Sequence, residues 1–328
     1  MVFGKFITTK WVIKMQQFFE QIRQLNNKPL MFGIYGAMGC FLTTFIIGEP
    51  VYLLFENVIF NNQDSEFYFI QLMIKVGVWS GIVITGACLS LIVGQNYYLH
   101  RRLISKRELI LALLGGSVVG FIAGAITQAI FAMLTSITES DFLMEISRIF
   151  SWTLQGMIVG YVMSFIIPNF KSNKGILGGA LGGFLGCIGF IITSYLFVDN
   201  LGRLIGMTIL GFFLGLMIAL IEQISRQASV LIHWGPKEKT ILSLGQNPVI
   251  LGSSPDSHIY LRKDHGYPPI TGKIYQQEDK IYLEFDPVYA KQKSMKKVKQ
   301  ELKNGDIRKF DKLSFEIQLS NPNLQKAT

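Results

Sequence analysis

Three basic residues stand just inside long apolar segments of this chain, where they could do chemistry. Each precedes a bulky apolar residue by four positions: Lys75 with Trp79, Arg148 with Trp152, and Arg203 with Met207. A charge inside a membrane-spanning segment is costly to hold and marks a functional site by default. If the three cations meet at one level, they form an anion-coordinating ring.

The alternative for these cations is an anchoring role. Acidic residues precede each of them in the sequence: Glu66 before Lys75, Asp141 and Glu145 before Arg148, and Asp199 before Arg203. Local pairing, or extension of the side chain to the membrane surface, then satisfies each charge. We favour anchoring over the ring.

The remaining residues form no motif of an enzyme, a metal site or an ion-coupled pump. No glycine-rich loop is followed by Lys and Ser or Thr, as phosphate binding requires. The histidines are not spaced as metal ligands, and none stands in a nucleophile-and-base arrangement. No Asp, Glu or His falls in the middle of an apolar segment, where proton or sodium coupling needs one. We therefore expect no enzymatic activity, no cofactor and no metal.

Composition places most of the chain in a membrane. Of the 328 residues, 50% are hydrophobic and only 16% are charged, against about a quarter charged in soluble domains. Six apolar runs are long enough to cross a bilayer: Leu30–Ile47, Ile70–Gly94, Leu109–Leu134, Ile149–Ile167, Gly175–Val198 and Leu204–Ile221. After Gln223, short alternating stretches between Gly and Pro predict β-strands. The predicted fold is an α-helical transmembrane bundle followed by an all-β domain.

Charge predicts the orientation of the bundle. The net charge is +9, and the basic residues gather in the N-terminal tail and in alternate connections: Arg101, Arg102, Lys106 and Arg107, then Lys171 and Lys174. The other connections are acidic: Glu49, Glu56, Asp64 and Glu66 in the first, Glu139, Asp141 and Glu145 in the third, Asp199 in the fifth. Positively charged loops are retained on the cytoplasmic side. Both termini are therefore expected in the cytosol, below a plasma (inner) membrane.

The N-terminal residues 1–28 predict an amphipathic helix. Its apolar positions recur at helical spacing: Trp11, Met15, Phe18, Ile22 and Leu25. Such a helix lies on the inner membrane surface or packs on the β domain, and we favour the membrane surface. The other predicted parts are a six-helix transmembrane domain over 29–226, a β domain over 229–320 and a tail over 321–328.

The transmembrane segments predict three copies of one helical hairpin. The first, third and fifth runs share a glycine motif, GAMGCF at 36–41, GSVVGF at 116–121 and GALGGF at 179–184. Each copy begins on the cytosolic side, so the repeats are related by a pseudo-threefold axis along the membrane normal. Small residues at four-residue intervals let helices approach closely. Cys40, Cys88 and Cys187 fall inside spans and are expected to be packing residues.

The C-terminal hundred residues resemble a forkhead-associated (FHA) domain. The resemblance rests on VILGSSPDSHIYL at 249–261, PPITGKI at 268–274, KIYLEF at 280–285, LKNGDI at 302–307 and LSFEI at 313–317. It covers about ninety residues and implies a β-sandwich of a family that typically binds phosphothreonine peptides. Gly252 and the Asn304-Gly305-Asp306 turn are then structural, since both stand where the chain must turn tightly.

The ligand residues that the resemblance implies are replaced in this chain. Ser253 stands where the family has an arginine that follows the glycine, and Pro268 and Thr271 stand where it has a serine and a histidine. Only Ser254 is retained. A phosphate carries about two negative charges and needs a guanidinium or several hydroxyl donors. We therefore expect recognition that does not depend on phosphorylation, with Lys263 or Lys273 as substitutes if phosphate is still read.

A basic run follows the strand at 280–285: Lys291, Lys293, Lys296, Lys297 and Lys299. One interpretation is a solvated loop, and the other is a patch that contacts anionic lipid headgroups. Nucleic-acid binding is not expected, because no aromatic residues alternate with this run as a base-stacking surface requires.

These observations lead to one function and two alternatives. The favoured hypothesis is a non-enzymatic scaffold in a bacterial membrane, whose bundle contacts the lipid bilayer and whose β domain binds a protein partner. The first alternative is a channel or transporter gated by the cytosolic domain. The second is a signalling receptor that reads phosphothreonine. The sequence leaves the partner and the oligomeric state open.

Overall fold

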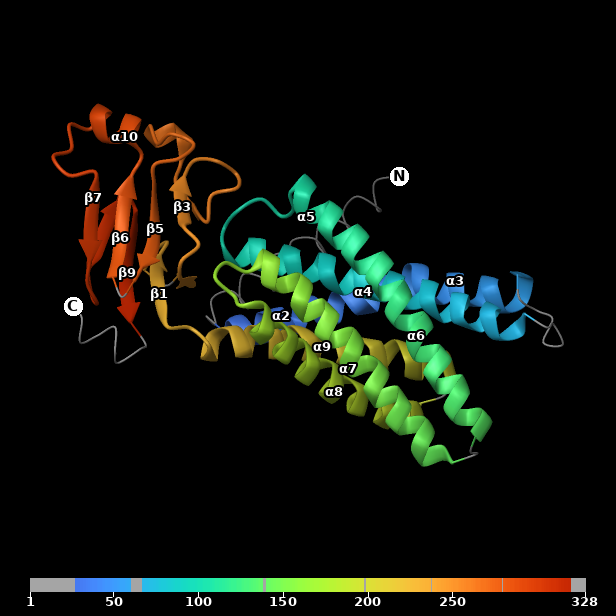
Figure 1. The fold of residues 1–328 in the computed structure, drawn as a ribbon. Helices are drawn as coiled ribbons and strands as arrows, with labels where there is room; N and C mark the ends of the chain where they lie inside the picture. The colour runs from blue at the N-terminus through green and yellow to red at the C-terminus, as the bar shows by residue number, and fades with distance from the viewer. Residues whose placement is uncertain are drawn as a thin grey trace, which may run out of the picture. The chain divides into compact units, whose positions relative to one another are not determined.

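The computed structural model describes residues 27–59, 67–137, 140–197, 199–236, 238–278 and 280–319. The predicted N-terminal helix, apart from Asn27 and Lys28, and the tail over 321–328 lie outside these residues. The chain divides into two compact units, a helical unit over Phe32–Arg226 and a second unit that contains Gln227–Thr328 (Figure 1).

The helical unit contains six apolar helices long enough to cross a membrane, as the sequence predicts. The first span comprises α2 (Lys28–Thr43), a π-helical turn η1 (Thr44–Gly48), α3 (Glu49–Leu54) and a second π-helical turn η2 (Phe55–Ile59). The third span comprises α5 (Lys106–Ile110), η3 (Leu111–Gly115) and α6 (Gly116–Ile137). The other four are single helices: α4 (Tyr68–Tyr98), α7 (Asp141–Ile166), α8 (Ser172–Leu196) and α9 (Asp199–Ile224). The protein is therefore membrane-embedded.

The first span is longer than the sequence pattern predicts. We expected it to end near Ile47 and placed Glu49 and Glu56 in the following loop, but both residues are helical. Pro50 lacks an amide proton and normally ends or kinks a helix. Here the π-helical turn over Thr44–Gly48 comes directly before it, and Pro50 then occupies the first turn of α3, where a missing amide proton costs little. The two glutamates thus become parts of the bundle.

Glycines bring the helix backbones into contact. A methyl group placed on Gly160 of α7 would lie 2.0 Å from the carbonyl oxygen of Gly175 on α8. The same holds between α2 and α9, where a methyl group on Gly36 would lie 2.1 Å from the carbonyl oxygen of Gly211. The three cysteines are buried and free, as expected of packing residues. Because lipid supplies no hydrophobic force between helices, this close approach is what holds them together.

The second unit is a C-terminal β-sheet domain. One sheet has the order β2 (Lys239–Leu244), β1 (Ala228–His233), β9 (Leu313–Leu319), β8 (Ile307–Phe310). The other has the order β4 (Ile259–Tyr260), β3 (Val249–Gly252), β5 (Gly272–Gln277), β6 (Lys280–Phe285), β7 (Lys299–Leu302). All pairs are antiparallel except β3 with β4. Alternate residues of β9 are buried, which gives the domain its apolar core.

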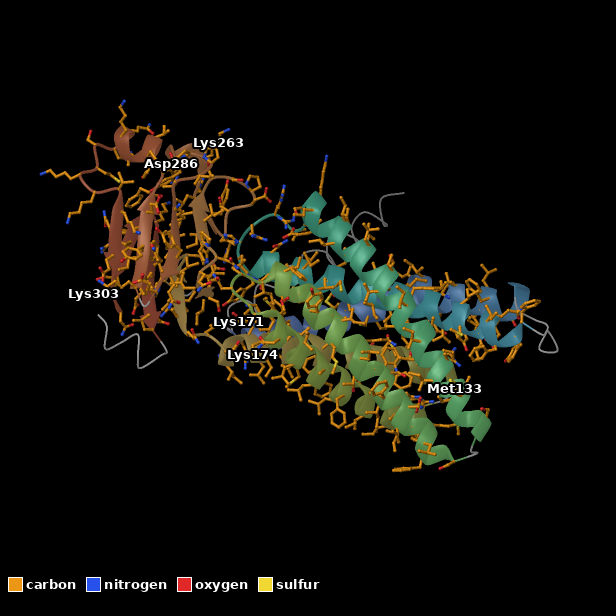
Figure 2. The ribbon with its side chains drawn as sticks, viewed as in Figure 1. Met133, Lys171, Lys174, Lys263, Asp286 and Lys303 are labelled. Carbon is orange, nitrogen blue, oxygen red and sulfur yellow. The ribbon has the colours of Figure 1, made fainter. Side chains whose placement is uncertain are left out.

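The strand register defines two ends of this domain. At the end that we call the root, Ala228 pairs with Leu244 and with Leu319. At the opposite end, the tip, Gly272 pairs with Phe285, and the loops over 253–271 and 286–298 leave the sheets. Figure 2 shows this separation, with Lys263 and Asp286 at one end of the strands and Lys303 at the other. The strand β1 starts at the root and β9 ends there.

Replacing Gly160 by Ala should destabilise the bundle, because the added methyl group collides with the backbone of Gly175. We expect a loss of about 1–3 kcal/mol, the usual cost of overpacking. The control is Gly115→Ala, where the nearest atom to the new methyl group is 3.6 Å away, an ordinary contact. Thermal unfolding in nanodiscs, followed by circular dichroism, should show a lower Tm only for Gly160→Ala. Equal melting of both variants would contradict the packing argument.

Candidate functional site

The tip of the β domain holds all four residues that the FHA resemblance singles out. The amide of Ser253 donates to the carbonyl oxygen of Pro268 at 2.9 Å, and that of Ser254 to the carbonyl oxygen of Pro269 at 3.2 Å. Thr271 donates its amide to Leu251 at 2.7 Å. The loops over 253–258 and 266–271 are therefore tied together by their backbones.

The hydroxyl groups at this tip make no hydrogen bond to a charged side chain among the described residues. Ser253 is buried, and Thr271 is fully buried with its hydroxyl lacking a hydrogen-bond partner among the described residues. The Ser254 hydroxyl accepts from the amide of Asp256 at 3.3 Å. Of the two candidate lysines, Lys273 pairs with Glu284 at 3.3 Å, and Lys263 is exposed on a short 3-10 turn. Arg262, on the same loop, is exposed and pairs with Asp264. Among the described residues, no cationic side chain hydrogen-bonds to Ser253.

Two further residues of this region have structural tasks. A methyl group on Gly252 would lie 2.0 Å from the carbonyl oxygen of Pro269, so no other residue fits where the two loops cross. The Nδ1 atom of His258 accepts the amide proton of Ile250 at 3.0 Å. His258 thereby fixes the start of β4 against β3.

The tip also exposes apolar side chains. Ile270 is 51% exposed and Val288 is 75% exposed. The two segments that carry them are joined, because the amide of Asp286 donates to the carbonyl oxygen of Thr271 at 3.0 Å. Val288 is the second residue of α10 (Pro287–Gln292), which Asp286 caps by accepting from the amides of Val288 and Tyr289. The tip thus offers apolar contacts beside the position where phosphate would bind in the family.

The basic run does not form one patch. Lys296, Lys297 and Lys299 line a groove of about 830 Å³, together with Arg308 and Lys309 of β8. Lys291 and Lys293 are exposed and lie outside the lining of this groove. We call it the β7–β8 groove, because β7 and β8 are the edge strands of their two sheets.

Aromatic rings from distant parts of the sequence form the wall of this groove. Tyr267 lies 6.2 Å from Tyr289 and 6.3 Å from Phe310 between ring centroids, and Phe285 completes the cluster. Burial raises the pKa of both the Tyr267 and the Tyr289 hydroxyl groups. In the sequence, no aromatic residues alternate with the basic run. In the fold, however, four aromatic residues line the same groove as three of its lysines. Phe285, Tyr289 and Phe310 are each less than 10% exposed, so their faces are not open for stacking.

In the helical unit, each of the three cations has a carboxylate partner. Arg148 donates from Nη1 to both oxygens of Glu145 at 3.0 and 3.1 Å, the local pair that the sequence predicts. Arg203 donates to Glu49 through Nε at 3.2 Å and Nη2 at 2.9 Å. The third pair joins Lys75 to Glu56 at 3.8 Å. The other acids that we expected as partners are outside the described residues (Glu66) or have undescribed side chains (Asp141 and Asp199).

The structure brings two of the three cations together. Lys75 Nζ lies 4.1 Å and the Arg203 guanidinium 5.0 Å from the centre of the Tyr52 ring. Arg148 instead lies 5.9 Å from the centre of the Phe190 ring. Below them, the rings of Trp79 and Trp152 meet edge to face at 6.0 Å. A mixed cluster of anchored ion pairs and aromatic rings therefore covers this end of the core, and it presents no unpaired cation.

The core beneath these rings is nearly closed. A cavity of about 10 Å³ is lined by Cys40, Trp152 and Gln155, among others. This volume holds about one water molecule. The Oε1 atom of Gln155 is buried without a hydrogen-bond partner among the described residues, so it is the natural acceptor for that water. This cavity at the centre of the described helices has room for a single water molecule and not for a solute.

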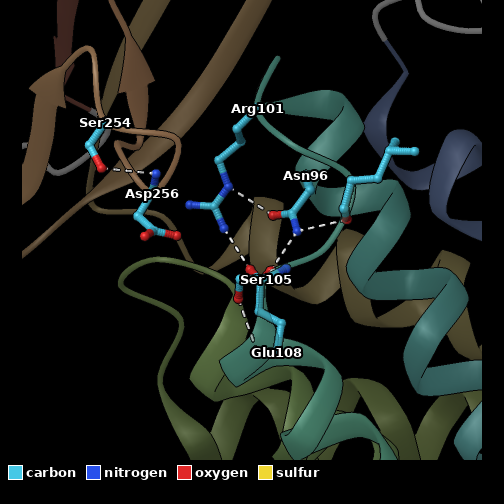
Figure 3. A network of polar contacts seen from close by, with 7 residues as sticks. Asn96, Arg101, Ser105, Glu108, Ser254 and Asp256 are labelled. Carbon is cyan, nitrogen blue, oxygen red and sulfur yellow. Dashed lines mark hydrogen bonds and ion pairs between the residues drawn. The ribbon is translucent and has the colours of Figure 1, made fainter. Parts of the chain in front are cut away.

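The opposite end of the helical unit has a fixed loop between α4 and α5 (Figure 3). The Arg101 guanidinium donates to Asn96 Oδ1 and to Glu108 Oε1, both at 2.8 Å. Ser105 and Glu108 form a reciprocal capping box at the start of α5. This network orders a loop that sequence charge alone predicts to be cytosolic.

Comparison of the chain with protein-family models, with curated proteins and with solved structures finds no match.

Three features of the sites were missed by sequence reasoning: the exposed pair Ile270 and Val288, the aromatic wall and the role of Glu49. The sequence does contain a sign of the exposed Ile270, because it follows two prolines in a loop, where an apolar side chain is often exposed. The other two depend on the tertiary fold and on the π-helical turn.

Substitution of Arg203 by Gln should destabilise the helical unit, because Glu49 is only 13% exposed and would be left as a partly buried, unpaired charge. We expect a loss of about 1–3 kcal/mol. The double variant Glu49→Gln/Arg203→Gln removes both charges and should recover at least half of the loss. Denaturant unfolding in nanodiscs, followed by the helical circular dichroism signal, measures both. A double variant as unstable as Arg203→Gln would show that the pair is not what holds this end together.

Proposed function

We propose that this chain is a multi-pass membrane scaffold whose β domain is an atypical FHA-like domain that binds a protein partner without reading phosphate. The observation that carries the proposal is the environment of Ser253. Ser253 is buried, its amide donates to Pro268, and no cationic side chain of the described residues hydrogen-bonds to it. A doubly charged phosphate has no charge-assisted partner there.

Several features of the fold support the FHA assignment. The domain has two sheets, and the segments of the resemblance fall on β3 to β6 and on β8 and β9. The turn before β8 contains Gly305 in the left-handed region, at φ 81°, and Asn304 accepts the amide proton of Leu319 at 3.0 Å. This turn has the structural role that the resemblance implies.

A protein partner explains the tip better than the alternatives. Ile270 and Val288 expose apolar surface on two loops that are bonded to each other. Exposed apolar groups on ordered loops are typical of protein contacts. A lipid-contacting role for the basic run has less support, since Lys296, Lys297 and Lys299 line the groove while Lys291 and Lys293 lie outside its lining.

The charge pattern supports a cytosolic location for both ends of the chain. Figure 2 places Lys171 and Lys174 at one end of the helical unit and Met133 at the other. By the positive-inside rule, the end with the lysines faces the cytosol. Ala228 follows directly after the last span, so we place the β domain on this same side, at the inner face of a bacterial plasma membrane.

The packed core favours an anchoring bundle over a channel. Trp79, Trp152 and Met207, the three residues that follow the cations by one turn, all belong to one buried cluster. This arrangement supports the proposed threefold repeat, with the second helix of each hairpin facing the centre. A core filled by these side chains serves to hold the helices together, and the proposal accordingly includes no enzymatic step and no cofactor.

Partner capture by the full-length protein should depend on the apolar tip and resist phosphatase. The change is Ile270→Ser/Val288→Ser, which removes two exposed apolar side chains. Burial of such a side chain contributes about 1.5–3 kcal/mol, so capture should fall roughly tenfold or more. The measurement is crosslinking and affinity capture from native membranes, with and without phosphatase treatment, read by quantitative mass spectrometry.

The matched control for this experiment is Ile307→Ser. Ile307 is also an exposed isoleucine, 60% accessible, but it lies on β8 toward the root. Its replacement should leave the captured set unchanged. Loss of the captured partners after phosphatase treatment would refute the proposal and favour the phosphothreonine receptor. Equal loss with both variants would indicate that the tip is not the contact.

A further inference from the structure

The β7–β8 groove combines features of a peptide-binding site. It is about 830 Å³, within the range of roughly 300–1,000 Å³ that is usual for ligand sites. The edge strands of both sheets line it, β7 through Lys299 and β8 through Arg308 to Phe310. An edge strand presents backbone donors and acceptors along one side, which an extended chain can pair with.

The rim of the groove is basic and largely uncompensated. Five of its lining residues are basic, and its acidic lining residue, Glu301, is paired with Lys280 at 3.2 Å. Among the described residues, no carboxylate lies within ion-pair distance of Lys296, Lys297 or Lys309. These three cations come from both sides of the groove. An acidic ligand that lies along it would meet charge on each rim.

The geometry of the other basic residues argues against a single phosphate as the ligand. The Arg308 guanidinium donates to its neighbour's carbonyl oxygen, Ile307 O, at 3.2 Å. Lys299 Nζ lies 4.0 Å above the Tyr282 ring and donates to Gln277 at 3.2 Å. Bidentate phosphate recognition needs a free guanidinium fork or several converging donors. Separate lysines distributed along two edges fit a ligand whose charges are also distributed.

The aromatic wall favours an acidic peptide over a nucleic acid as the extended ligand. Nucleic-acid bases need open ring faces to stack on, whereas Phe285, Tyr289 and Phe310 are packed against one another and buried. An aliphatic or aromatic side chain needs only their edges as a wall. In an extended peptide, alternate side chains point to opposite sides. Acidic residues can therefore face the rim while apolar residues between them face the wall.

We propose that the β7–β8 groove binds an extended segment of a partner protein in which acidic and apolar residues alternate. This inference rests on the proposed protein-binding function and names the chemistry of the partner. The groove is continuous with the tip, since Tyr267 precedes the Ile270 loop and Tyr289 follows Val288. Three residues of each edge strand line the groove, 299–301 of β7 and 308–310 of β8, and Ile307 is outside the lining. The paired segment therefore spans about 10 Å at roughly 3.3 Å per residue.

The test uses the full-length protein in nanodiscs of zwitterionic lipid and a fluorescein-labelled octapeptide of alternating glutamate and leucine. Fluorescence anisotropy measures the affinity. The variant Lys296→Glu/Lys297→Glu should weaken binding at least about tenfold, and Lys309→Glu, on the opposite rim, should weaken it as well. The matched control Lys291→Glu/Lys293→Glu reverses two charges of the same basic run outside the groove and should change the affinity less than twofold. A peptide with four glutamates followed by four leucines should bind more weakly.

Three outcomes would overturn the proposal. In the first, the alternating peptide fails to bind the unmodified protein. In the second, both double variants lose affinity equally, which indicates non-specific attraction. In the third, a thymidine oligonucleotide or vesicles with anionic lipid bind with the predicted variant pattern while the peptide does not. The scaffold function is judged separately: if phosphatase-resistant capture persists in Lys296→Glu/Lys297→Glu and the peptide does not compete with it, the groove proposal fails and the scaffold stands.

Discussion

Direct contact between helix backbones is the constraint on which the rest of the helical unit depends. In lipid there is no hydrophobic drive between helices, so dispersion and weak Cα–H···O contacts must hold them. Both act only at short range, and glycines such as Gly160 and Gly175 remove the side chains that would keep the backbones apart. The closeness of α7 and α8 then lets the Trp152 and Phe190 rings meet at 6.2 Å. The packed core is therefore a consequence of the backbone contact.

The ion pairs at one end of this core follow from the same closeness. A cation one turn from a closely packed core cannot be hydrated on every side, so it needs a carboxylate within reach. Glu49 and Glu56 reach Arg203 and Lys75 because the first span continues past Pro50. Were the helix to end at Ile47, these acids would lie in a solvated loop. The π-helical turn is thus the local feature that converts a loop acid into a partner for a charge on another helix.

The sequence predicts what local chemistry controls and fails where tertiary contacts decide. Six spans are predictable because a bilayer forces the backbone to satisfy its own hydrogen bonds over a fixed length. The glycine contacts and the Arg148–Glu145 pair follow from spacing within the chain. The Arg203–Glu49 pair, separated by 154 positions, does not, since Pro50 signals the end of a helix. The groove is also hidden from the sequence, because only the tertiary fold brings Tyr267, in a loop, to Phe310 at the end of β8.

In the proposed recognition of a partner, the tip supplies apolar contact and the groove supplies charge. At the tip, Ser253 is buried and Ile270 and Val288 are exposed, so contact there comes from removing apolar surface from water, which supplies affinity without fixing direction. The rim lysines remain hydrated in the free domain, so leaving them unpaired costs little. In the proposed complex, they accelerate the encounter with an acidic segment and set its register along the two edge strands, and reversing their charge turns this attraction into repulsion. If the domain is FHA-like, as we propose, the serine at position 253 leaves it without the guanidinium through which phosphorylation could control binding. What remains is a recognition surface whose strength depends on salt and on the partner's sequence.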